Sequence, residues 1–210
     1  MDKAQQTQVH MLLEKCQGKL INNNFDASIF TSKEEVLEFL KKQIPAGSTV
    51  GTGGSMTLET VGVIDWLRAS SSITYYDRVG ASDVEKILLA GQHADYYLMS
   101  SNAITLDGQL YNVDGRGNRL SALIYGPKKV FIVAGYNKIV KDIDDAITRV
   151  ETIAAPQNCL RLNKGTPCTK LGTCAHCNMK DTICNSYVVT RRNAIPNRIH
   201  VLLVEEELGY

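Results

Sequence analysis

The sequence lacks the features that identify membrane, secreted and nucleic-acid-binding proteins. No apolar run reaches the length of about 20 residues that spans a bilayer. The segment Met1–Gln6 is polar and has no apolar signal-peptide core. The formal net charge of the 210 residues is only +1, which gives no basic surface for nucleic acid. We therefore expect a cytoplasmic protein that binds neither membranes nor nucleic acid.

Two common nucleotide-binding motifs are also missing, although the chain has a glycine-rich stretch in the right kind of place. The dinucleotide fingerprint needs a third glycine after Gly51 and Gly53, and that position holds Met56. A phosphate-binding P-loop needs a lysine after its glycines, and no lysine lies between Gly51 and Arg68. The stretch therefore belongs to neither motif.

This glycine-rich stretch is nevertheless the strongest local signal in the chain. An expected strand at Ser48–Val50 enters it, and an expected helix from Thr57 to Arg68 leaves it. Glycine allows close approach of a ligand, and a helix start offers unpaired N–H groups. We predict that Gly53, Gly54 and Ser55 bind a small anion. The alternative is a tight turn with no ligand.

A second polar cluster follows the expected strand Tyr96–Met99. Its candidate ligand-binding residues are Asn102, Asn112, Asp114, Asn118 and Arg119. The carboxyl ends of parallel strands meet at one sheet edge, where ligands bind. We therefore predict one pocket shared with the glycine-rich stretch, in which Arg119 is the main charge partner. The alternative is a structural hairpin around the turn Asp107-Gly108.

Helices alternate with short apolar strands along most of the chain. This order predicts an α/β fold with a mainly parallel sheet flanked by helices, plus one antiparallel piece at the hairpin. We expect one domain over residues 1–210. It would include an N-terminal helix within residues 1–24 and a cysteine-rich segment at residues 165–186.

Four cysteines lie within this cysteine-rich segment. They are Cys168, Cys174, Cys177 and Cys184, with the spacing C-x5-C-x2-C-x6-C. Clustered thiolates suit an iron–sulfur cluster or a zinc ion. The spacing fits neither a ferredoxin run nor a zinc ribbon, so an unligated or redox-active set of thiols stays open. Whatever occupies the site, we predict that the four sulfur atoms lie close together around one locus.

Two further ionisable residues have competing interpretations. Glu59, in the first turn of the helix after the glycines, is either a helix-dipole partner or a catalytic carboxylate. Lys138 follows an expected strand at Val130–Ala134 and could reach an anion, but a solvated surface lysine is the favoured interpretation.

Several motifs in order carry a resemblance to one family. The segment from Ser100 to Arg119, followed by Gly126–Lys129, resembles the LUD (lactate utilisation) domain family. Gly53–Glu59 and the ending Leu203–Tyr210 are similar to that family's short, stand-alone members. The resemblance covers the chain after the first helix. It implies a fold similar to that of ribose-5-phosphate isomerases, glucosamine-6-phosphate deaminases and CoA transferases, and a link to L-lactate oxidation.

Two classes of function follow from these observations. The chain is either an enzyme subunit of 2-hydroxy-acid oxidation or a ligand-binding, regulatory domain with a phosphosugar-isomerase-like pocket. The ferredoxin-like cysteine runs of the larger lactate-oxidation subunits are absent, and no local nucleophile–base motif is present. The candidate partners are a small anionic ligand, iron–sulfur oxidoreductase subunits and a second copy of this chain.

Overall fold

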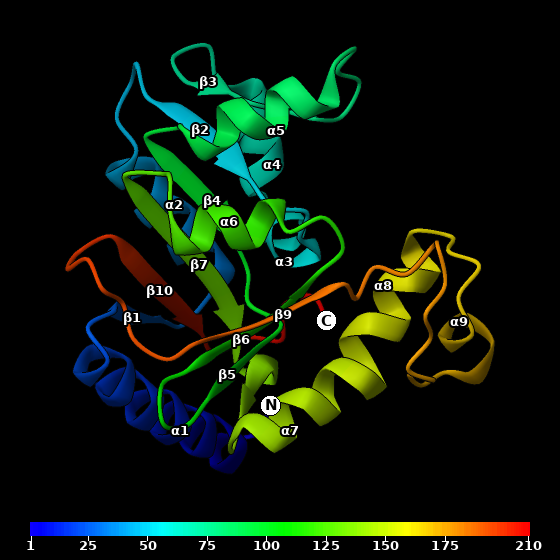
Figure 1. The fold of residues 1–210 in the computed structure, drawn as a ribbon. Coiled ribbons are helices and arrows are strands. Elements are labelled where there is room, and N and C mark those ends of the chain that lie inside the picture. The colour runs from blue at the N-terminus through cyan, green and yellow to red at the C-terminus, as the bar shows by residue number, and fades with distance from the viewer.

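A six-stranded sheet, in which every neighbouring pair is parallel, forms the centre of the structure (Figure 1). The computed structural model describes all 210 residues. In spatial order the strands are β1 (Asp26–Phe30), β10 (Ile199–Val204), β7 (Lys129–Gly135), β4 (Tyr96–Met99), β2 (Thr49–Thr52) and β3 (Thr74–Tyr75). The predicted α/β fold with a mainly parallel sheet flanked by helices is therefore confirmed.

A smaller sheet of four strands lies beside the first. Its spatial order is β8 (Ile139–Val140), β5 (Ala103–Thr105), β6 (Leu110–Asp114) and β9 (Ser186–Thr190). Strand β6 is antiparallel to both β5 and β9, whereas β5 and β8 are parallel. The expected antiparallel hairpin is thus the middle of a separate mixed sheet.

Helices cover both faces of the central sheet and extend from it on one side. The longer ones are α1 (Lys3–Asn22), α2 (Lys33–Gln43) and α5 (Val84–Gln92). The shorter ones are α3 (Met56–Val61), α4 (Val63–Ala69), α6 (Asn118–Ile124), α7 (Ile143–Arg149), α8 (Ala155–Arg161) and α9 (Cys168–Leu171). A 3-10 turn, η1, spans Tyr136–Lys138, and a π-helical turn, η2, spans Val150–Ala154. None of the helices has the length and apolar composition needed to cross a bilayer.

Alternate residues of the central strand β7 point to opposite faces of the sheet and enter different cores. Val130, Ile132 and Ala134 pack with buried residues of α1 and α6. Phe131 and Val133 pack with buried residues of α2, α3 and α4. Because both faces are covered, the strand is a continuous apolar run, as expected for a buried parallel strand. Burying each larger side chain contributes about 1.5–3 kcal/mol.

Three local elements differ from their predicted form. The helix expected from Thr57 to Arg68 is two helices, because Gly62 adopts a left-handed conformation (φ 82°) between them. The helix expected to end at Ala154 continues through η2 into α8, as one rod in Figure 1. The hairpin loop has three residues rather than two, with Gly108 left-handed (φ 80°) and its N–H donated to Thr105 O (2.9 Å).

The end of β7 is fixed against the last residues of the chain. Tyr136 N donates to Glu206 O (3.2 Å), and Asn137 Nδ2 donates to Gly209 O (3.0 Å). Leu208 N donates to Asn137 Oδ1 (3.1 Å). These bonds bring residues 206–210 over the carboxyl end of the sheet, so the chain's last segment contributes to the surface where ligands bind in such folds.

A substitution at Gly135 tests this close approach. A Cβ there would lie 2.6 Å from Leu208 N and against Glu206 O, both backbone atoms. We expect Gly135→Ala to lower the free energy of unfolding by about 1–3 kcal/mol through overpacking. Gly18→Ala, on an exposed helix position with nothing within 4 Å of the added carbon, is the control. It should stabilise by about 0.5–1 kcal/mol. Equal effects of the two substitutions in urea unfolding would contradict the close approach.

Candidate functional site

One cavity of about 240 Å³ opens at the carboxyl end of the central sheet. Six of the predicted binding residues line it together: Gly54, Ser55, Asn102, Asp114, Asn118 and Arg119. They come from the turn after β2, the segment after β4, the end of β6 and the start of α6. The structure thus brings the glycine-rich stretch and the second polar cluster to one place.

Three other predicted residues lie outside the lining of this cavity. Gly53 sits beneath the side chain of Arg119, where a Cβ would be 2.9 Å from Cδ. Asn112 is fully buried behind the cavity. Glu59 is exposed on α3 and is not among the lining residues. Its position gives no support to a catalytic carboxylate, whereas an acid in a first helical turn is ordinary.

The Arg119 guanidinium holds the wall of the cavity together. It donates five hydrogen bonds of 2.8–3.0 Å: Nε to Asp114 Oδ1, Nη1 to Ser100 O and Asn112 Oδ1, and Nη2 to Asn102 Oδ1 and Val113 O. Asp114 also accepts a bond from Leu120 N (3.1 Å). Because a guanidinium has five N–H donors, Arg119 has none left for a ligand. The positive charge that a ligand would meet must therefore come from the other cations of the cavity.

The glycines of the stretch are explained by contacts within the protein. A Cβ on Gly51 would lie 2.8 Å from Gly91 Cα, so the glycine lets α5 pack on β2. Gly53 makes room for Arg119, and Gly54 lies directly against the Arg78 guanidinium. Ser55 caps α3 by accepting from Leu58 N (3.3 Å). The glycines are therefore weak evidence for a ligand, and the charges around the cavity are stronger evidence.

Lys138 lies in a different environment from the one that the sequence favours. It was expected on the solvated surface, but only 2% of it is exposed, and it lines the cavity. Its ammonium donates to the main-chain O of Tyr210 (2.7 Å), the last residue of the sequence, and pairs with no Asp or Glu side chain. Burial, with Arg149 and Arg119 nearby, lowers the pKa of Lys138 to about 7. Its place directly after β7, at the carboxyl edge of a parallel sheet, was the available signal.

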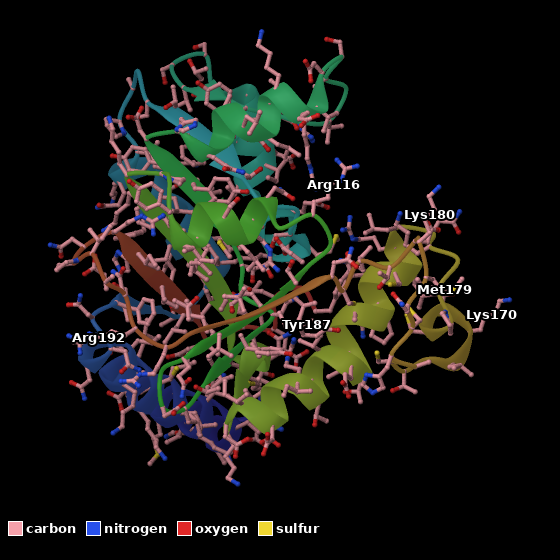
Figure 2. The ribbon with its side chains drawn as sticks, in the orientation of Figure 1. Arg116, Lys170, Met179, Lys180, Tyr187 and Arg192 are labelled. Atoms are coloured by element: carbon pink, nitrogen blue, oxygen red, sulfur yellow. The ribbon has the colours of Figure 1, made fainter.

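Three exposed arginines complete the cationic lining. Arg78 comes from the loop after β3, Arg116 from the β6–α6 loop and Arg161 from the end of α8. Figure 2 shows Arg116 projecting from its loop. The single acidic side chain of the cavity, Asp114, is already bonded to Arg119. The cavity is therefore strongly positive, and we call it the cationic cavity.

A second cavity, of about 140 Å³, is lined by sulfur. Its cysteines are Cys159, Cys168, Cys174, Cys177 and Cys184. The four predicted cysteines thus share one cavity, and Cys159, which lies outside the cysteine-rich segment, joins them from α8. We call it the thiol cavity.

Two thiols of this cavity are held in their neutral form. Burial and, to a lesser degree, the neighbouring cysteines raise the pKa of Cys184 to about 12. Burial also raises the pKa of Cys159. Such thiols are poor nucleophiles, because the thiolate is the reactive form. No group of three or more His, Cys, Asp or Glu side chains is arranged around a point where it could hold a single metal ion.

Comparisons with known proteins agree with this fold. The family pattern of the LUD domain matches residues 13–204. The chain belongs to the LUD domain family. No curated protein matches it. Among solved structures, a DUF162 family protein from Deinococcus radiodurans is similar, with a TM-score of 0.56 and 13% sequence identity. The match covers 93% of this chain and 98% of that protein, and at this identity it shows the fold alone.

In this LUD domain the two cavities lie on either side of the same elements. Asn158 and Arg161 of α8 line the cationic cavity, whereas Cys159 of the same helix lines the thiol cavity. Between residues 182 and 184 the chain alternates in the same way, with Ile183 facing the cationic cavity and Cys184 the thiol cavity. The two cavities therefore share α8 and residues 182–184 as a common wall.

Removing the Arg119 side chain tests its bracing role in the LUD domain. In Arg119→Ala the Asp114 carboxylate, whose side chain is 9% exposed, loses its charge partner. We expect the free energy of unfolding to fall by about 3–5 kcal/mol. Arg116→Ala removes an exposed neighbouring arginine and should change stability by less than about 0.5 kcal/mol. A loss below about 1 kcal/mol for Arg119→Ala, the range of exposed ion pairs, would rule out the bracing role.

Proposed function

We propose that this LUD domain binds a small organic anion of the 2-hydroxy-acid type, such as L-lactate, in the cationic cavity. The observation that carries the proposal is the buried Lys138 ammonium, which lines the cavity without an Asp or Glu partner. A buried cation costs stability unless an anion compensates it. The family's link to lactate utilisation gives the substrate class, and the positive lining supports the sign of its charge.

Binding would place the ligand carboxylate against Lys138. Polar groups at the same depth include the buried Ser100 and Ser101 and the half-buried Asn102 and Asn118, which suit hydroxyl and carboxylate oxygens. Arg119 Nη2 donates a hydrogen bond to the amide oxygen of Asn102 (2.9 Å) and so holds this side chain in place. In this proposal the braced wall sets the orientation of the ligand, and Lys138 supplies the charge.

The thiol cavity gives the second part of the proposal, an iron–sulfur cluster. Cysteine sulfur is the ligand type that such clusters require, and the five sulfurs surround a volume rather than a point. Four of the five cysteines would hold the cluster, which would supply one-electron transfer to or from an oxidoreductase partner. Zinc is the alternative occupant, and it would require the thiolates to draw together around one ion.

A non-catalytic, ligand-binding role is the second candidate function. No histidine lines the cationic cavity, and the hydroxyls of Ser100 and Ser101 donate to backbone carbonyls rather than to a base. A domain of this kind would bind the anion and report it to a partner without turnover. Assaying the protein with L-lactate and an artificial electron acceptor, before and after iron loading, separates the two functions.

The titration of Lys138 predicts a pH-dependent affinity. Below its pKa of about 7 the side chain is charged, whereas above it anion binding must first recharge the amine. Burial lowers the pKa of Arg149, which faces Lys138, to about 10, so this arginine is still mainly charged when Lys138 titrates. We expect L-lactate affinity, measured by calorimetry, to fall about tenfold or more between about pH 6 and about pH 9. Lys138→Met should bind weakly and without this dependence.

Lys170→Met is the matched control for this experiment. Lys170 is exposed on α9, where Figure 2 shows it projecting away from the rest of the molecule. The control should keep both the affinity and the pH dependence of the unchanged protein. An affinity that is the same at both pH values, or a Lys138→Met protein that binds normally, would rule out Lys138 as the charge partner.

Iron loading tests the thiol cavity separately. Anaerobic reconstitution should give bound iron and sulfide with a visible absorption band, and Cys168→Ala should lower both by half or more, because Cys168 is a buried member of the cavity. Cys16→Ala is the control, since Cys16 is buried in the α1 core and contacts Thr105 O (3.6 Å). Equal iron content in both variants would contradict the cluster, and stoichiometric zinc with no iron would favour the alternative.

A further inference from the structure

The cationic cavity carries more positive charge than one carboxylate needs. Arg78, Arg116 and Arg161 line it, and none of them forms an ion pair. Asp77, the acid next to Arg78 in sequence, is paired with Arg68 at 2.6 Å. Together with Lys138, four cations therefore face a cavity whose only acidic side chain is already bonded to Arg119.

These cations lie at two depths. Lys138 is 2% exposed and marks the interior of the cavity. Arg78 and Arg116 are exposed and mark its rim, and the Arg78 guanidinium rests on the bare backbone of Gly54. Arg161 is also at the rim, where Asn158 Oδ1 accepts bonds from its Nε (3.2 Å) and Nη2 (2.7 Å). A ligand held at both depths needs two separate anionic groups.

We infer that the ligand is a phosphorylated 2-hydroxy acid, with its carboxylate at Lys138 and its phosphate monoester between Arg78 and Arg116. This inference rests on the proposed anion site and adds the second group. A phosphate monoester carries a charge of about −1.5 to −2 at neutral pH and offers three acceptor oxygens. The planar fork of arginine donates to such oxygens in pairs, which makes arginine better suited to phosphate than lysine is. Two unpaired arginines at the rim match that chemistry.

Three related ligands test the inference by calorimetry at one fixed ionic strength. The probe is 3-phosphoglycerate, D-glycerate lacks its phosphate, and glycerol 3-phosphate lacks its carboxylate. We expect 3-phosphoglycerate to bind about tenfold or more tighter than either, because charge-assisted hydrogen bonds at both ends add. Equal affinity of 3-phosphoglycerate and D-glycerate would overturn the inference but leave the anion site intact. Binding of none of the three, nor of L-lactate, would overturn the proposed function itself.

Variants of the rim assign the phosphate to its arginines. Arg78→Gln and Arg116→Gln together should remove the advantage of 3-phosphoglycerate and change D-glycerate affinity by less than about twofold, since the second ligand does not reach the rim. Arg192→Gln is the control, because Arg192 is exposed and lies far from the cationic cavity in Figure 2. A loss shared equally by both ligands would overturn the assignment. Tighter binding of malate than of 3-phosphoglycerate would overturn the inferred phosphate and show that the second anionic group is a carboxylate.

Discussion

The buried ion pair between Arg119 and Asp114 is the interaction on which the site depends. It joins the start of α6 to the end of β6, and through Ser100 and Asn102 it reaches the segment that follows β4. The pair is stable only because every donor of the guanidinium has an acceptor, since a buried charge without partners costs several kcal/mol (roughly 3–5 when one partner is removed). Gly53 belongs to the same arrangement, because any side chain there would displace the arginine. Most side chains of the second polar cluster are therefore bonded to Arg119 and form the wall of the cavity.

The cations that remain free are what distinguish the cavity from a structural network. Lys138 is buried beside Arg149 and Arg119, an arrangement that penalises its charged form and lowers its pKa to about 7. Such a placement costs stability, and perturbed ionisable groups in cavities are typical of functional sites. The thiol cavity on the other side of α8 shares this wall.

Local sequence patterns predict most helices and strands, but they do not predict which individual residues are buried or meet in a cavity. Strand β10 was predictable at Ile199–Val204, because a short apolar run is typical of a buried parallel strand. The break at Gly62 was missed, because a lone glycine does not reveal a left-handed conformation. The burial of Lys138 depends on the packing of residues 206–210 over β7, a contact between distant segments. Cys159 was missed for the same reason, since only the fold brings α8 to the cysteine-rich segment.

The most direct test of the anion site is the ionisation of Lys138 itself. Selective isotope labelling of lysine side chains lets NMR follow this one amine through a pH titration, with Lys138→Met assigning its signal. Without ligand we predict a pKa near the value of about 7 that burial imposes, well below the ordinary 10.5. Saturation with L-lactate should raise that pKa, because an anion at the ammonium favours its charged form. A pKa of about 10.5 in both states, or no change on adding ligand, would contradict the assignment of Lys138 as the charge that holds the anion.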